Sequence, residues 1–206
     1  EYIYQPNYAN PRKSPLAFTE DEEQEMATRI FTSFYGQVNF TRNFYFKSSL
    51  GLSIENERFG FMYPQKAPGE ALTEAGVNLD NDYQAVWTNL LNYSKELGKN
   101  TLYLTMGQEV QYNRNEYYTM WGQNQPFTRN LWWNMGTVDQ GNNSSGSDLT
   151  ETAISSFFGR ATFNFRNLLI FNASGRYDGA SQLKGDQWDF FPSASIAWRL
   201  SNMGFM

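Results

Sequence analysis

Residues 168–178, which read LLIFNASGRYD, show the pattern that decides the fold class. Apolar or small residues occupy the odd positions from 169 to 177, and polar residues occupy the even positions from 172 to 178. Successive side chains of a β-strand point to opposite faces of the sheet, so this spacing produces one apolar and one polar face. The stretch therefore predicts an amphipathic β-strand.

The same alternation recurs in residues 44–55, 160–165 and 193–200, whereas no stretch of comparable length keeps a helical stripe. Strands should therefore dominate the fold. We predict an antiparallel meander of about seven strands, with the expected ranges 28–41, 43–57, 85–95, 101–118, 151–165, 168–178 and 190–201.

The connections between these strands fall into two kinds. Residues 41–43, 96–100 and 166–167 are short, polar and typical of tight turns. The alternate connections, near 58–84, 119–150 and 179–189, are long and rich in Gly, Asn, Asp, Gln, Pro and Trp. A meander places all short turns at one end and all long loops at the other, which is typical of a transmembrane β-barrel.

Periodicity leaves one alternative open, because a soluble glycan-binding β-sandwich also shows alternation and aromatic loops. Two observations favour the barrel. Strands of roughly 11 to 18 residues exceed the usual length of about 5 to 6. Aromatic residues also gather near the expected strand ends, where the interfacial girdles of a membrane protein lie.

The composition excludes several classes of function. Among 206 residues there is no Cys and no His, so thiol chemistry and the commonest general base and zinc ligand are missing. We predict neither an enzyme nor a cofactor. The formal net charge of −5 argues against a nucleic-acid partner, which would need a basic surface.

Two loops could hold a cation, but we predict no metal site. The acidic run 20–25 lacks the alternating oxygen ligands and the turn glycine of a calcium loop. Residues 139–148 contain GNNSSG, which offers oxygen atoms but reads better as a surface loop.

The candidate ligand-binding residues lie in the longest connection. They are Trp121, Trp132 and Trp133 with the neighbouring Arg129 and Asn134. Aromatic faces beside hydrogen-bonding side chains suit sugars or peptides. Loop tryptophans also serve simply to pack a loop, so both roles stay open.

The polar face of the strands should line the barrel lumen. The residues expected there are Arg160, Asn164, Asn172, Arg176, Asp178 and Arg199. The residues expected to face lipid are Ala161, Phe163, Leu169, Phe171, Ala173, Ile196 and Trp198. A register slip of one residue would move three arginines into hydrocarbon, at roughly 2 to 4 kcal/mol each near the midplane.

Three blocks then carry a family resemblance. Residues 156–165 (SFFGRATFNF), 176–181 (RYDGAS) and 191–201 (FPSASIAWRLS) resemble consecutive barrel blocks of SusC/RagA-type TonB-dependent outer-membrane transporters. Residues 91–107 resemble the preceding hairpin in weaker form. The chain departs from the family at Asn167-Leu168, where a basic-aromatic pair is usual, and near Met203-Gly204, where an acidic residue is usual.

The resemblance implies a barrel of about 22 strands, of which this chain can supply only a third. The plug domain and the TonB-contacting segment are then expected outside the chain. The implied function is import of an oligosaccharide or peptide across the outer membrane of a Gram-negative bacterium of the Bacteroidota type. The implied partners are outer-membrane lipid, a SusD-like surface lipoprotein, and TonB through the plug.

Overall fold

The computed structural model describes residues 20–65 and 72–202. Seven strands account for most of them: β1 (Glu22–Thr41), β2 (Phe44–Tyr63), β3 (Glu74–Leu97), β4 (Asn100–Gln123), β5 (Asn143–Phe165), β6 (Leu169–Ala180) and β7 (Trp188–Trp198). Three short 3-10 turns complete the described elements: η2 (Thr128–Asn130), η3 (Met135–Thr137) and η4 (Leu200–Asn202). Within the described ranges, no helix has the length and apolar character needed to cross a membrane.

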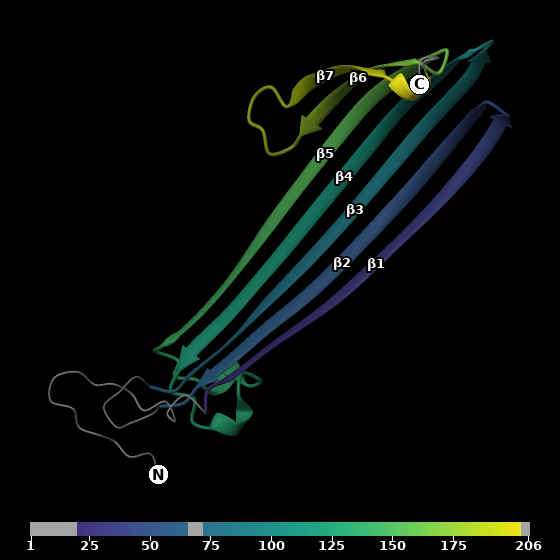
Figure 1. Cartoon of the computed structure of the whole chain (residues 1–206). Helices are drawn as coiled ribbons and strands as arrows, with labels where there is room; N and C mark the ends of the chain where they lie inside the picture. Colours follow the sequence, from purple (N-terminus) through teal and green to yellow (C-terminus); the bar gives the residue numbers. More distant parts are fainter. Residues whose placement is uncertain (1–19, 66–71, 203–206) are drawn as a thin grey trace, which may run out of the picture. The chain divides into compact units, whose positions relative to one another are not determined.

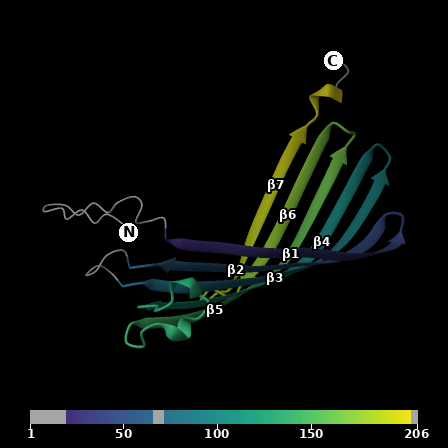
Figure 2. The ribbon, with the colours of Figure 1, turned by 90° about the horizontal axis from the view of Figure 1, so that it is seen from below.

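The strands form one sheet in the order β1-β2-β3-β4-β5-β6-β7, so each strand pairs with its neighbours in the chain (Figures 1 and 2). The register of the last three strands is antiparallel. Phe171 of β6 lies between Phe163 and Ile196, and Asn172 lies between Thr162 and Ser195. The prediction of an all-β antiparallel meander is confirmed.

Two of the three short turns use a left-handed backbone. Gly98 has φ +65°, and Arg166 and Asn167 have φ 50° and 57°. Tight hairpins need positive φ values, which glycine adopts freely and asparagine tolerates better than most residues. The amide of Leu168 closes the last turn by donating to the carbonyl of Phe165 at 2.9 Å.

The strands are longer than the hydrophobic alternation indicated. Of the expected connections, 58–63 and 74–84 are strand, as are 119–123 and 143–150. Residues 74–84 and 143–150 are rich in Asn, Asp, Ser and Gly, which are typical of connections, so their composition hides the strand. Residues 66–71 of the first connection, and Met203-Gly204, lie outside the described residues.

The chain divides into two compact units. The loop unit comprises the described parts of residues 1–29, 55–82 and 115–150, including the 124–142 connection. The hairpin unit comprises residues 30–54, 83–114 and the described part of 151–206, including the three short turns. Strands β1 to β5 contribute residues to both units.

The buried apolar side chains differ between the units. The loop unit has a small core of Met62, Ala75, Val77 and Trp132, with Leu79, Leu131 and Met135 packed against it. The hairpin unit instead leaves large apolar side chains exposed, and Ile196 and Trp198 are 71% and 59% exposed. Apolar area of this kind must find cover in a membrane or a partner.

We predict that residues 1–206 expressed alone will aggregate or will require detergent to remain in solution. The edge strands β1 and β7 present unpaired backbone groups, and the apolar face of the hairpin unit adds to the exposed surface. Size-exclusion chromatography with and without detergent checks this. A monodisperse monomer that unfolds cooperatively without detergent would contradict it.

Candidate functional site

The polar face of the hairpin unit carries groups of hydrogen-bonded side chains. Asn172 lies at its centre, where its Oδ1 accepts from Arg160 Nη2 at 3.2 Å and from Thr162 Oγ1 at 2.7 Å. The Asn172 amide then donates to Ser195 Oγ at 3.3 Å. Side-chain bonds of this kind tie β5, β6 and β7 together across their register.

Arg176 anchors the same face closer to the long connections. Its Nε donates to Asp178 Oδ1 at 2.7 Å, and its Nη2 donates to Glu109 Oε1 at 3.1 Å and to Ser156 Oγ at 2.9 Å. The guanidinium also lies 5.4 Å from the ring centroid of Phe158, a cation–π contact. Two carboxylates therefore flank the one positive charge, and the arginine is held in a single orientation.

The remaining residues expected on the polar face meet at the turn after β5. Asn164 donates its amide to Asn167 Oδ1 at 3.4 Å, and Arg199 donates to the same oxygen. The structure therefore joins Arg160 with Asn172, Arg176 with Asp178, and Asn164 with Arg199 through Asn167. Glu109 completes this surface, although the sequence interpretation had not singled it out.

The opposite face of the hairpin unit is apolar and banded. One band contains Phe163, Phe171 and the aliphatic Ile196 in register, and an aromatic band contains Phe157, Tyr177, Trp188 and Phe190. The ring of Trp188 stacks 4.9 Å from that of Tyr177. Bands rich in aromatic residues on either side of an apolar strip resemble the girdles at the two membrane interfaces.

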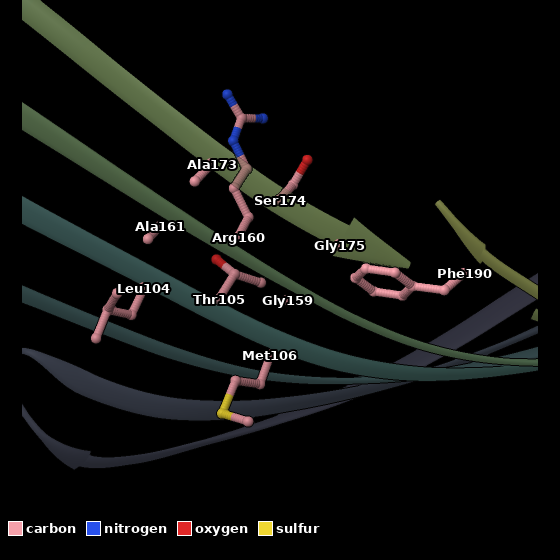
Figure 3. Close-up of a pocket in the computed structure, with 10 residues that line it drawn as sticks. All are labelled: Leu104, Thr105, Met106, Gly159, Arg160, Ala161, Ala173, Ser174, Gly175 and Phe190. Atoms are coloured by element: carbon pink, nitrogen blue, oxygen red, sulfur yellow. The ribbon is translucent and has the colours of Figure 1, made fainter. Parts of the chain in front are cut away.

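Small residues fill the strip between the bands. Gly159 pairs with Gly175, and Ala161 pairs with Ala173. They form the floor of a shallow apolar pocket of about 380 Å³. Figure 3 shows the side chains of Leu104 and Met106 on one face of the sheet and those of Arg160 and Ser174 on the opposite face.

In the loop unit, the 124–142 connection covers one face of the strands. Trp132 packs so closely on Gly60 that a Cβ there would lie 2.2 Å from the indole ring. Gln125 is buried and holds the loop by donating to the carbonyls of Leu131 and Asn134, both at 3.3 Å. We call this surface the loop-covered face.

The predicted ligand-binding residues do not form one cluster, because some are buried and others are exposed. Trp132 is 5% exposed and belongs to the core under the loop, whereas Trp133 is 60% exposed and lies 4.4 Å from the Arg58 guanidinium. Arg129 and Asn134 are exposed on the same connection. Trp121 stands apart from them, in β4.

The other face of the loop unit carries a ladder of polar pairs, and we call it the ladder face. Its residues alternate along β3 with Ala75 and Val77, which lie under the loop. The pairs are Asn78 with Thr119 at 2.7 Å, Glu74 with Gln123 at 2.9 Å, and Asp80 and Asp82 with Asn115 at 2.6 and 2.8 Å. Trp121 falls between Thr119 and Gln123 at the same parity, so it belongs to this face.

The sequence interpretation missed the ladder face because these residues lay inside expected connections. The available signal was the spacing of polar residues at every second position from 78 to 82. Among the described residues, no group of three or more Asp or Glu side chains is arranged to hold a metal ion.

Comparisons with known proteins give one consistent result. No family model matches the chain. TonB-dependent receptor P3 of Formosa agariphila is 29% identical over 193 residues, covering 91% of this chain and 19% of the receptor. TonB-dependent receptor SusC of Bacteroides thetaiotaomicron is 24% identical over 129 residues, covering 60% of this chain and 12% of SusC.

The solved structure of the RagAB peptide transporter matches the fold with a TM-score of 0.85 at 18% identity. That match covers 97% of this chain and 23% of the transporter chain. The chain spans about a fifth of the length of the first curated relative that it matches.

We predict that Gly60→Val in the complete protein will detach the 124–142 loop. A side chain at residue 60 must displace Trp132, at a cost of about 1 to 3 kcal/mol for an overpacked core. Limited proteolysis should then cleave the loop faster. Gly36→Val is the matched control, because nothing lies within 4 Å of a Cβ at Gly36, and equal cleavage of the two variants would contradict the prediction.

Proposed function

Because the chain carries barrel strands of a SusC/RagA-type TonB-dependent transporter, we propose that it forms part of the wall through which this protein imports a nutrient. The membrane crossed would be the outer membrane of a Gram-negative bacterium of the Bacteroidota type. The observation that carries the proposal is the hairpin unit, whose strands have one banded apolar face and one internally bonded polar face.

The two faces support a proposal for the two sides of the wall. The apolar face, with Phe171, Ala173 and Ile196, would contact lipid, and the polar face, with Asn172 and Arg176, would line the lumen. Charged groups on the polar face are held by hydrogen bonds, Arg176 by Glu109 and Asp178, and Arg160 by Asn172. Such pairing holds wall residues rigidly against water and passing solutes.

The soluble β-sandwich alternative would require a second sheet over this apolar face. The described residues form a single sheet in which Ile196 and Trp198 are largely exposed. Lipid is the cover that suits aromatic bands of this kind, which favours the barrel.

The family resemblance supplies the remaining parts of the proposal. The short turns would face the periplasm, and the long connections would face the outside. A SusD-like lipoprotein would capture the ligand over the long connections, and TonB would act on a plug. The ligand would be an oligosaccharide or a peptide, the latter being what RagAB is described as transporting.

Uptake measurements test the proposed import. We expect that a strain lacking the complete gene will lose uptake of one class of fluorescent oligosaccharide or peptide, and that the gene will restore it. A protonophore should abolish the restored uptake, because import of this type draws on the proton gradient. Restored uptake that persists with the protonophore, or unchanged uptake of both classes in the deletion strain, would refute energy-dependent import.

A pair of substitutions tests the facing of the wall. Ala173→Arg should destabilise the folded barrel in lipid vesicles by about 2 to 4 kcal/mol if residue 173 lies near the bilayer midplane. Ser193→Arg, on the polar face of β7 opposite Ser174, should leave the folded fraction almost unchanged. Heat-modifiable migration on SDS gels measures the folded fraction, and equal losses in both variants would reject this facing.

A further inference from the structure

Three aromatic rings form a row on the ladder face of the loop unit. Phe59, Phe61 and Tyr63 are spaced two residues apart on β2, so they share one face. The ring centroids of Phe59 and Phe61 are 6.1 Å apart, and those of Phe61 and Tyr63 are 5.1 Å apart and stacked. The alternate residues Gly60 and Met62 lie under Trp132 on the loop-covered face.

A fourth aromatic residue lies on the same face, across β3 from this row. The Phe61 ring lies over Gly76, where an added Cβ would be 2.5 Å from it. The bonded pairs of Asn78 with Thr119 and Glu74 with Gln123 bracket Gly76, which places Trp121 opposite it on β4. The missing side chain of Gly76 therefore leaves a gap that Phe61 covers beside Trp121.

Fixed hydrogen-bonding groups surround the aromatic row. Tyr63 donates its hydroxyl to Glu23, and this bond raises the pKa of Tyr63 to about 12. Asn115 holds Asp80 and Asp82 by one oxygen each. A carboxylate can accept about four hydrogen bonds, so each retains acceptor capacity for a ligand.

We propose that the ladder face binds an uncharged oligosaccharide, with the pyranose rings stacked on Phe59, Phe61 and Trp121. This assignment rests on the proposed import function and names its substrate class. The C–H face of a sugar ring is apolar and suits the negative face of an aromatic ring. The sugar hydroxyls then donate to Asp80 and Asp82, which are already oriented, so little ordering cost remains on binding.

Charge sets the class of sugar. The carboxylates of Glu23, Glu74, Asp80 and Asp82 all lie on this face, and the cation described there, Arg29, is already paired with Glu55 at 2.5 Å. Arg58 lies on the loop-covered face beside Trp133. A sulfated or uronic oligosaccharide would bring its negative charges against these carboxylates and be rejected. The backbone of a bound peptide would find no free backbone groups on β3 and β4 to hydrogen-bond, because both strands are already paired on each side within the sheet.

Isothermal titration with the complete, detergent-solubilised protein tests the assignment. The probes are uncharged cello-, laminari- and maltohexaose, the anionic tetragalacturonate, and a lysine-rich decapeptide. Phe61→Leu keeps the apolar cover over Gly76 but removes the ring, and it should weaken binding of the preferred hexaose about tenfold. Phe61→Tyr should restore binding, and Trp133→Leu, on the opposite face, is the matched control.

Several outcomes would overturn the assignment. They are no hexaose binding by the wild type, equal hexaose binding by wild type and Phe61→Leu, a loss only in Trp133→Leu, or tighter binding of tetragalacturonate or the peptide. Folding of each variant is confirmed by heat-modifiable migration. If the wild type shows proton-driven uptake but Phe61→Leu binds the hexaose as tightly as the wild type, only the ladder-face assignment is rejected. If the wild type shows no energy-dependent uptake, the import function itself is rejected.

Discussion

The alternation of side chains between two faces of a strand is the constraint on which this structure depends. Each strand must satisfy two environments at once, and a shift of one residue would exchange them along the whole strand. In the hairpin unit the pairing of Phe171 with Phe163 and Ile196 fixes the apolar side. The same register then brings Asn172 against Thr162 and Ser195, so one choice of pairing satisfies both faces.

The alternation also explains which parts could be predicted from sequence. In residues 168–178 apolar and polar residues alternate sharply. Their spacing therefore predicts the strand itself and which of its side chains lie on the polar face. Residues 74–80 also alternate, with Ala75, Val77 and Leu79 under the loop, but the Gly, Asn and Asp residues between them are typical of connections. Their composition therefore predicted a connection where the backbone ladder in fact continues.

The separation of the three tryptophans could not follow from sequence. Trp132 is buried because a distant strand offers Gly60 as a site of close approach, and this contact joins residues far apart in the chain. Trp121 lies on the other face because of its parity in β4. A glycine inside a strand often marks such an approach, so Gly60, Gly76 and Gly122 were the available signals.

Pairing only between chain neighbours has a consequence for how the sheet assembles. Hairpins closed by short turns, such as that at Arg166-Asn167, can zip up locally and rapidly. Closing the 124–142 connection between β4 and β5 costs about 2 kcal/mol more in chain entropy than closing a two-residue turn. Burial of Trp132 and the bonds of Gln125 offset that cost, so the loop that covers β2 and β3 also helps β5 to join the strands before it.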